Sequence, residues 1–200
     1  MADDTTTDGM LDLTPQTRVI ARLAERVDDG SLGDPTPCPE YAVRNLLGHL
    51  TQLAVAFRDA ARKDFGPTTD TDPGSSLPDI GEDWRAELPK ALDELAEAWR
   101  DPAAWEGETR AGGVTLPAVV MAQVAVDELV IHGWDLARAT GQEYVPDPGC
   151  LAAAYGLLDQ SRAPEDRGEI FGPIVEVGDE APLLDRAIGL AGRHPDWPAA

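Results

Sequence analysis

Hydrophobic residues recur every three or four positions along four long stretches of this chain, which is the spacing of amphipathic helices. The predicted helices cover residues 14–27, 39–63, 84–100 and about 115–141. Thr14 followed by Pro15 is typical of a helix start, and Gly141 is typical of a helix end. The fourth stretch is apolar on nearly every side through Val126, so we expect it to be the central and most buried helix.

The remaining segments are shorter or more polar. Residues 64–83, rich in Gly, Pro, Thr, Ser and Asp, predict a long surface loop that acts as a connector or as a lid. Apolar spacing predicts two further short helices over residues 149–161 and 182–190. Residues 171–177 alternate like a strand, but no other segment offers a pairing partner, so we expect an extended segment packed on the helices.

The length of 200 residues fits one domain with a single core. The acidic residues 1–13 are expected to form a flexible N-terminus. Alanine supplies much of the 42% hydrophobic content and only 6% is aromatic, which suits closely packed helices. We therefore predict a single all-α domain over residues 14–200, a four-helix bundle with short additional C-terminal helices and an extended segment.

The net charge of the chain limits which kinds of partner it can bind. With 37 acidic and 16 basic residues, the formal net charge is -21, which repels phosphate backbones and anionic lipid surfaces. We therefore expect no nucleic acid and no membrane partner. The N-terminus lacks the features of a signal peptide, and the longest uncharged apolar run, roughly 114–126, is too short to span a bilayer. A cytoplasmic protein is expected, and a homodimer stays open.

Several common chemistries have no support in the sequence. No Gly-rich phosphate loop, Ser-His-Asp arrangement or dinucleotide-binding fingerprint is visible. Cys38 and Cys150 are too few and too far apart for a disulfide framework or a metal knuckle. We expect both to be reduced thiols, and Cys38 stays open as a residue near a site.

Glu128, His132 and Asp135 leave one face of the predicted helix over residues 115–141, within about 60° of one another. Apolar residues such as Met121 share that face, which indicates that it belongs to the core. Buried carboxylates and imidazoles need partners, and a metal ion satisfies a Glu and a His one helical turn apart. A buried hydrogen-bonded pair or a partly solvated face is the alternative that the spacing leaves open.

His49 is a further candidate for the same site. It lies in the middle of the apolar side of the 39–63 helix, where a histidine taken alone is more often a hydrogen-bonded core residue. Neighbouring antiparallel helices of a bundle can bring it beside Glu128 and His132. The third histidine, His194, stands near the C-terminus and is expected to be exposed.

Asp135 has three roles open to it: a metal ligand, an acceptor for a histidine N–H, or an ion-pair partner for Arg138. We favour the acceptor, because a metal-bound histidine usually gives its other ring nitrogen to a carboxylate or a carbonyl. In that role Asp135 would orient a ligand without touching the metal.

Two motifs give a resemblance to a known family. One is TPCPEYAVRNLLGH at residues 36–49, and the other is ELVIHGWDLARATG at residues 128–141. Together they resemble the actinobacterial metal-binding proteins of the DinB/YfiT-like superfamily, in particular the N-terminal domain of mycothiol-dependent maleylpyruvate isomerase. The resemblance covers most of the chain. It implies a four-helix bundle with a divalent metal ion held by His49, Glu128 and His132.

The resemblance also implies a low-molecular-weight thiol, such as mycothiol or bacillithiol, as a cosubstrate. Three protein ligands leave a coordination position open, as in catalytic sites, and a metal-bound thiol is deprotonated and nucleophilic. We expect a thiol-dependent S-transferase or isomerase acting on an electrophilic small molecule. A metal-dependent hydrolase and a non-catalytic metal-binding protein are the alternatives. Two imidazoles and a carboxylate suit zinc first, and also nickel, iron or manganese.

One difference from the isomerase is expected. The isomerase has a C-terminal sterol-carrier-like domain that contributes an arginine to its site, and this chain is expected to have no room for such a domain. Without that arginine, maleylpyruvate isomerisation is less expected of this chain. The expected metal site does not depend on the arginine.

Overall fold

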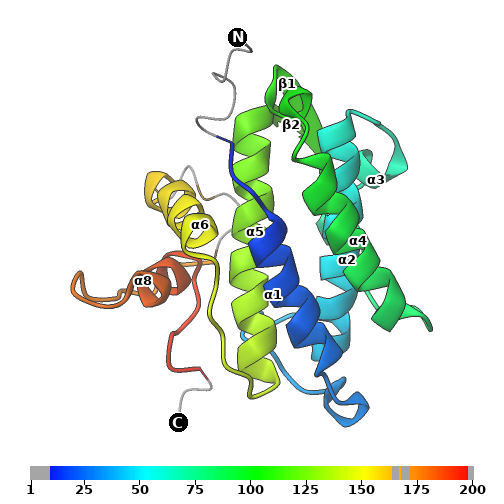
Figure 1. The fold of residues 1–200 in the computed structure, drawn as a ribbon. Coiled ribbons are helices and arrows are strands. Elements are labelled where there is room, and N and C mark those ends of the chain that lie inside the picture. The colour runs from blue at the N-terminus through cyan, green and yellow to red at the C-terminus, as the bar shows by residue number, and fades with distance from the viewer. Residues whose placement is uncertain (1–9, 164–166, 168–171, 198–200) are drawn as a thin grey trace.

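Four long helices form a bundle in the computed structural model, which describes residues 10–163, 167 and 172–197. They are α1 (Thr14–Glu25), α2 (Val43–Arg62), α4 (Trp84–Ala98) and α5 (Ala118–Ala139). Helices α1 and α2 each pack against both α4 and α5, which places α1 diagonally opposite α2 (Figure 1). The predicted all-α four-helix bundle is confirmed.

Helix α5 is buried along most of its length, as its apolar composition predicts. Of its 22 residues, 15 are buried. It packs against α1, α2, a C-terminal helix and a β-hairpin, so a residue on almost any of its faces lies in the interior. Polar side chains on α5 therefore need partners inside the protein.

A β-hairpin, which the sequence analysis does not predict, precedes α5. Strands β1 (Glu108–Ala111) and β2 (Val114–Pro117) pair in antiparallel fashion. Gly112 and Gly113 connect them with φ of 58° and 75°, the left-handed backbone that a two-residue hairpin turn requires. The expected helix start at Thr115 is therefore wrong, because that residue pairs with β1 and α5 begins only after β2.

The predicted loop, residues 64–83, contains a short helix, α3 (Pro67–Asp70), and a 3₁₀ turn (Pro73–Ser75). Hydrogen bonds hold the segment on two sides. The backbone N–H of Gly113 donates to the carbonyl oxygen of Thr69 at 2.9 Å, and Nδ2 of Asn45 donates to the carbonyl oxygen of Pro78 at 2.8 Å. The segment is therefore tied to the hairpin near its start and to α2 near its end.

Two shorter helices follow, α6 (Pro148–Gln160) and α8 (Leu183–Leu190). They pack against each other, and α6 packs against α5 (Figure 1). Both agree with the predicted ranges to within one residue. The described part of the predicted extended segment, residues 172–177, contains no strand; the backbone N–H of Val175 donates to the carbonyl oxygen of Gly189 at 3.0 Å. Residue 171 lies outside the described residues.

The N-terminal segment expected to be flexible, residues 1–13, is described only from residue 10. In that part Leu13 is 1% exposed and belongs to the core at the start of α1. Within the described ranges, no helix combines the length and the apolarity that crossing a bilayer needs.

Gly48 on α2 marks a close approach between the segment 64–83 and the bundle. A Cβ at this position would lie 2.5 Å from the carbonyl carbon of Asp79, so Gly48→Ala must push the main chain of that segment away. We expect a loss of about 1–3 kcal/mol in the free energy of unfolding, measured by urea denaturation.

Gly156→Ala on α6 is the matched control for this variant. Nothing lies within 4 Å of its Cβ position, so the substitution should be neutral or stabilising. Equal stability of the two variants would contradict the close packing at Gly48.

Candidate metal centre

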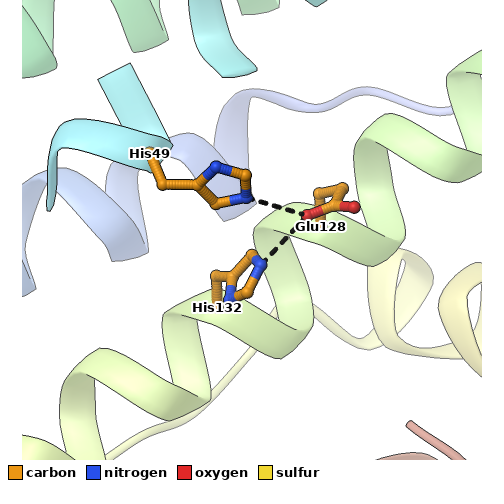
Figure 2. Close-up of side chains that lie close together, drawn as sticks. All are labelled: His49, Glu128 and His132. Atoms are coloured by element: carbon orange, nitrogen blue, oxygen red, sulfur yellow. Dashed lines mark ion pairs between the residues drawn. The ribbon is translucent and has the colours of Figure 1, made fainter. Parts of the chain in front are cut away.

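Helices α2 and α5 bring His49, Glu128 and His132 together in the interior, where the three side chains point toward one another (Figure 2). Oε2 of Glu128 lies 3.1 Å from Nε2 of His132 and 3.7 Å from Nε2 of His49. One potential ligand atom from each residue lies within 4.8 Å of the other two; the part of the chain that the structure describes contains no other such group. We call these three residues the His/Glu cluster.

The local sequence explains why the His/Glu cluster is buried. Glu128 and His132 are one turn apart on α5, so their side chains leave the same side of that helix. His49 stands one turn from the buried residues Leu46 and Leu53 on α2 and is itself only 7% exposed. The two imidazole rings meet edge to face, with their centroids 4.9 Å apart. Ordinary helix packing between α2 and α5 therefore forces three polar groups into contact.

Asp135 contacts the cluster through His132. Its Oδ2 lies 2.9 Å from Nδ1 of His132 and accepts a hydrogen bond from Nη2 of Arg193 at 3.2 Å, while Asp135 is 0% exposed. Arg138, the ion-pair partner considered for Asp135, instead donates Nε to the carbonyl oxygen of Trp197 at 2.9 Å. Since Nδ1 is held by a carboxylate, Nε2 of His132 is the ring nitrogen that faces the other two members of the cluster.

Contacts among the residues of the cluster and with Asp135 stabilise the charged forms of Glu128 and His132. Burial opposes the ionised form of Glu128, but its close contacts with the imidazoles of His132 and His49 outweigh burial and hold the pKa of that carboxyl well below its usual range. Burial also opposes a charged His132, yet its hydrogen bond to Asp135 and its ion-pair contact with Glu128 raise its pKa to about 9. In the metal-free protein the charged ring of His132 therefore lies between two carboxylates, and its Nε2 proton faces Glu128 in a position that a divalent cation can take over.

A cavity of about 600 Å³ lies against the cluster, with His49 and Glu128 in its lining. Residues of α2 and α5 form part of its walls, and the hairpin and residues 67–76 form the rest. The segment predicted as a connector or a lid is thus a wall of this cavity. A volume of this size is typical of sites for small organic molecules.

The family model of the mycothiol maleylpyruvate isomerase N-terminal domain matches residues 13–137. The chain belongs to this family. The match runs from α1 almost to the end of α5, so it includes all three residues of the His/Glu cluster. The resemblance inferred from the two sequence motifs is therefore confirmed.

Two proteins of Mycobacterium tuberculosis are similar to this family member over most of its length. They are "Uncharacterized protein MT0763" of strain CDC 1551 / Oshkosh and "Uncharacterized protein Rv0738" of strain ATCC 25618 / H37Rv. Each is 28% identical over 193 residues, which covers 87% of this chain and 91% of the relative.

Solved structures show a shared fold. The crystal structure of the mycothiol-dependent maleylpyruvate isomerase matches with a TM-score of 0.60 and 20% identity, over 96% of this chain and 90% of that one. The structure of a histidine-to-alanine mutant of the isomerase matches with a TM-score of 0.53 and 20% identity, over 86% and 76% of the two chains. The first likeness covers 96% of this chain and so extends past residue 137.

Arg193 is the residue beside the cluster that the sequence analysis misses. It follows α8 and lies 58 positions after Asp135, so no helical spacing links the two. The only sequence signal that points to it is an arginine placed directly after the apolar residues 187–192. Tyr41 is also missed; its ring centroid lies 5.1 Å from that of His49.

The other candidates from the sequence are not members of the cluster, although Cys38 lies close enough to interact electrostatically with Glu128 and Asp135. The thiol of Cys38 is half-buried and is not one of the clustered groups, and burial raises its pKa to about 11. Neither Cys38 nor Cys150 forms a disulfide. His194 is exposed, as expected, and its Nδ1 accepts a hydrogen bond from the backbone N–H of Asp196 at 3.3 Å.

Asp127 is a buried carboxyl next to the cluster on α5, 4% exposed, and its Oδ1 has no hydrogen-bond partner among the described residues. Burial, followed by the charge of Glu128, raises its pKa well above the ordinary value. A carboxyl whose pKa is higher in the folded than in the unfolded chain costs stability as the pH rises above about 4. Asp127→Asn should therefore gain stability over wild type between about pH 4 and pH 8, by about 1.4 kcal/mol for each unit of raised pKa.

Urea denaturation of the metal-free protein, with a chelator present, measures this gain at both pH values. Asp93→Asn on the exposed side of α4 is the matched control and should show no gain that grows with pH. A gain for Asp127→Asn that is equal at both pH values would show that the carboxyl is not the cause.

Proposed function

We propose that this chain binds a divalent metal ion through Nε2 of His49, the carboxylate of Glu128 and Nε2 of His132, and that it uses the ion to activate a low-molecular-weight thiol. The reaction would be S-transfer to an electrophilic small molecule, or its thiol-assisted isomerisation. The observation that carries the proposal is the convergence of two imidazoles on one carboxylate oxygen, at 3.1 and 3.7 Å, beside a cavity.

The donor set fits such an ion. Two imidazoles and a carboxylate, with a position left for a further ligand, are typical of catalytic zinc sites, and they also suit nickel, iron and manganese. Asp135 holds Nδ1 of His132, which is how proteins commonly orient a metal-bound histidine. Arg193 offsets the buried charge of Asp135, so this orienting carboxylate has a partner of its own.

The nucleophile is expected to come from outside the chain. When bound, a divalent ion would supply the Lewis acid that lets a thiol lose its proton at neutral pH. The chain's own thiol near the site is unsuited to this task, because burial raises the pKa of Cys38 to about 11 and its sulfur is not part of the cluster. The role of the protein is then to hold the cluster, orient His132 and enclose the reacting molecule.

Family membership makes mycothiol the first thiol to test, because both the family and the matched crystal structure are named for it. A metal-dependent hydrolase, which would need no thiol, is the alternative enzyme class. Non-catalytic metal binding is the third reading. The cavity beside the cluster favours an enzyme over this third reading, since a purely structural metal site needs no space for a small molecule.

Elemental analysis of the natively purified protein tests the metal ligands. Wild type should carry a divalent ion, and His49→Ala and His132→Ala should each lose most of it, because two protein ligands hold a metal far more weakly than three. His194→Ala is the matched control, since it removes an exposed histidine outside the cluster. If His49→Ala kept as much metal as His194→Ala, the ligand assignment would be wrong.

Calorimetric titration of mycothiol into the zinc-loaded protein tests the thiol. We expect binding to the loaded wild type and none to the metal-stripped protein, because the thiol sulfur would take the open coordination position. If the titration of mycothiol into the loaded protein releases no heat, the thiol part of the proposal is wrong, and the proposed metal site is unaffected. Turnover of an ester or an amide without any thiol would favour the hydrolase instead.

A further inference from the structure

The lining of the cavity is poor in positive charge. Among the described residues that line it, none is a lysine or an arginine, and the ionisable side chains are those of His49, Glu128 and Asp72. Asp72 is itself acidic and accepts a hydrogen bond from the backbone N–H of Gly74 at 2.8 Å. Apart from a metal ion, the lining therefore offers no cation that could pair with an anionic substrate.

Polar and apolar groups are separated along the cavity. The lining contains apolar side chains that are at most 8% exposed, namely Leu53, Phe57, Ala111 and Met121. The lining hydroxyls within residues 67–76 are exposed, so they stand at the mouth, whereas the hydroxyl of Thr51 on α2 donates to the carbonyl oxygen of Leu47 at 3.0 Å. A molecule that fills the cavity thus meets hydroxyls where it enters and hydrocarbon further in.

Two arginines on the surrounding elements form ion pairs outside the cavity. Arg58 on α2 pairs with Asp59 at 2.7 Å, and Arg110 on β1 pairs with Asp70 at 3.0 Å. Neither arginine belongs to the cavity lining. These two guanidinium groups are therefore held in ion pairs and add no positive charge to the lining.

We infer that the electrophile is an uncharged molecule with an apolar body and not a carboxylate; this inference rests on the proposed function. The two positive charges of a divalent ion would be balanced by one negative charge from Glu128 and one from a thiolate, which leaves nothing to offset an anion. A carboxylate placed in the apolar depth would lose its hydration without gaining a partner. Alkyl or aryl compounds that carry a leaving group on carbon fit the cavity chemically.

Transfer of a thiol to an aryl chloride is a suitable probe reaction. The thiolate sulfur forms a bond to the ring carbon that carries chlorine, the carbon–chlorine bond breaks, and its electron pair leaves with chloride. The thiol proton passes to solvent. All atoms and charges are thereby accounted for without an oxidant or a reductant.

A chlorodinitrobenzoic acid and its methyl ester provide a matched pair of probes, because they share the reacting carbon and differ by one negative charge. With mycothiol and the zinc-loaded wild type, kcat/KM for each probe is divided by the rate constant of its spontaneous reaction with the thiol. This ratio should be at least about tenfold higher for the ester than for the free acid.

Two arginine substitutions test whether the charge of the lining sets this preference. Val114 on β2 belongs to the lining and is 53% exposed, so Val114→Arg adds a cation at the mouth without burying it. It should lower the preference for the ester at least about threefold. Val119→Arg on α5 is the matched control: Val119 is 48% exposed and outside the lining, so the preference should stay unchanged.

Calorimetric binding of the two probes without thiol separates this inference from the proposed function. Tighter binding of the ester without any turnover supports the inference and removes the thiol chemistry. Equal or tighter binding of the free acid overturns the inference, even if the metal and the thiol bind as proposed. Binding of neither probe also overturns it.

Discussion

The contact between α2 and α5 at the His/Glu cluster is the constraint on which the rest of the structure depends. It places two imidazoles and a carboxylate where a helix bundle would otherwise bury hydrocarbon, and such groups are tolerated only when each one has a partner. The partners extend beyond the cluster, because His132 contacts Asp135 and Asp135 contacts Arg193. A chain of polar contacts therefore runs from α2 through α5 to the C-terminal part of the protein.

This chain of contacts gives the C-terminal part a role in the site. Helix α6 covers α5 from outside the bundle, α8 packs on α6, and the chain that follows α8 brings Arg193 to Asp135. The carboxylate of Asp135 is completely buried, so without a cation beside it the charge would be strongly unfavourable. The orientation of His132 thus depends on residues that lie outside the four-helix bundle.

Helical periodicity was sufficient to predict the bundle and to place His49, Glu128 and His132 on inward helical faces, whereas their grouping as one ligand set came from the family resemblance. The hairpin was missed because each of its strands has four residues, too few to show an alternating pattern, although Gly112 and Gly113 were visible as a turn signal. Arg193 was missed for a different reason: its place beside α5 follows from the path of the chain after α8, which no local pattern records.

Two kinds of structural element form the wall of the cavity. Its inner end belongs to regular helices whose packing fixes the cluster, whereas much of its wall belongs to the hairpin and to residues 67–76, which lie outside the four long helices. Exchanging side chains in that outer wall changes the shape and polarity that an incoming molecule meets, with little consequence for the bundle. Changes in that outer wall can therefore alter which molecules fit the cavity while the helix packing that holds the His/Glu cluster stays as it is.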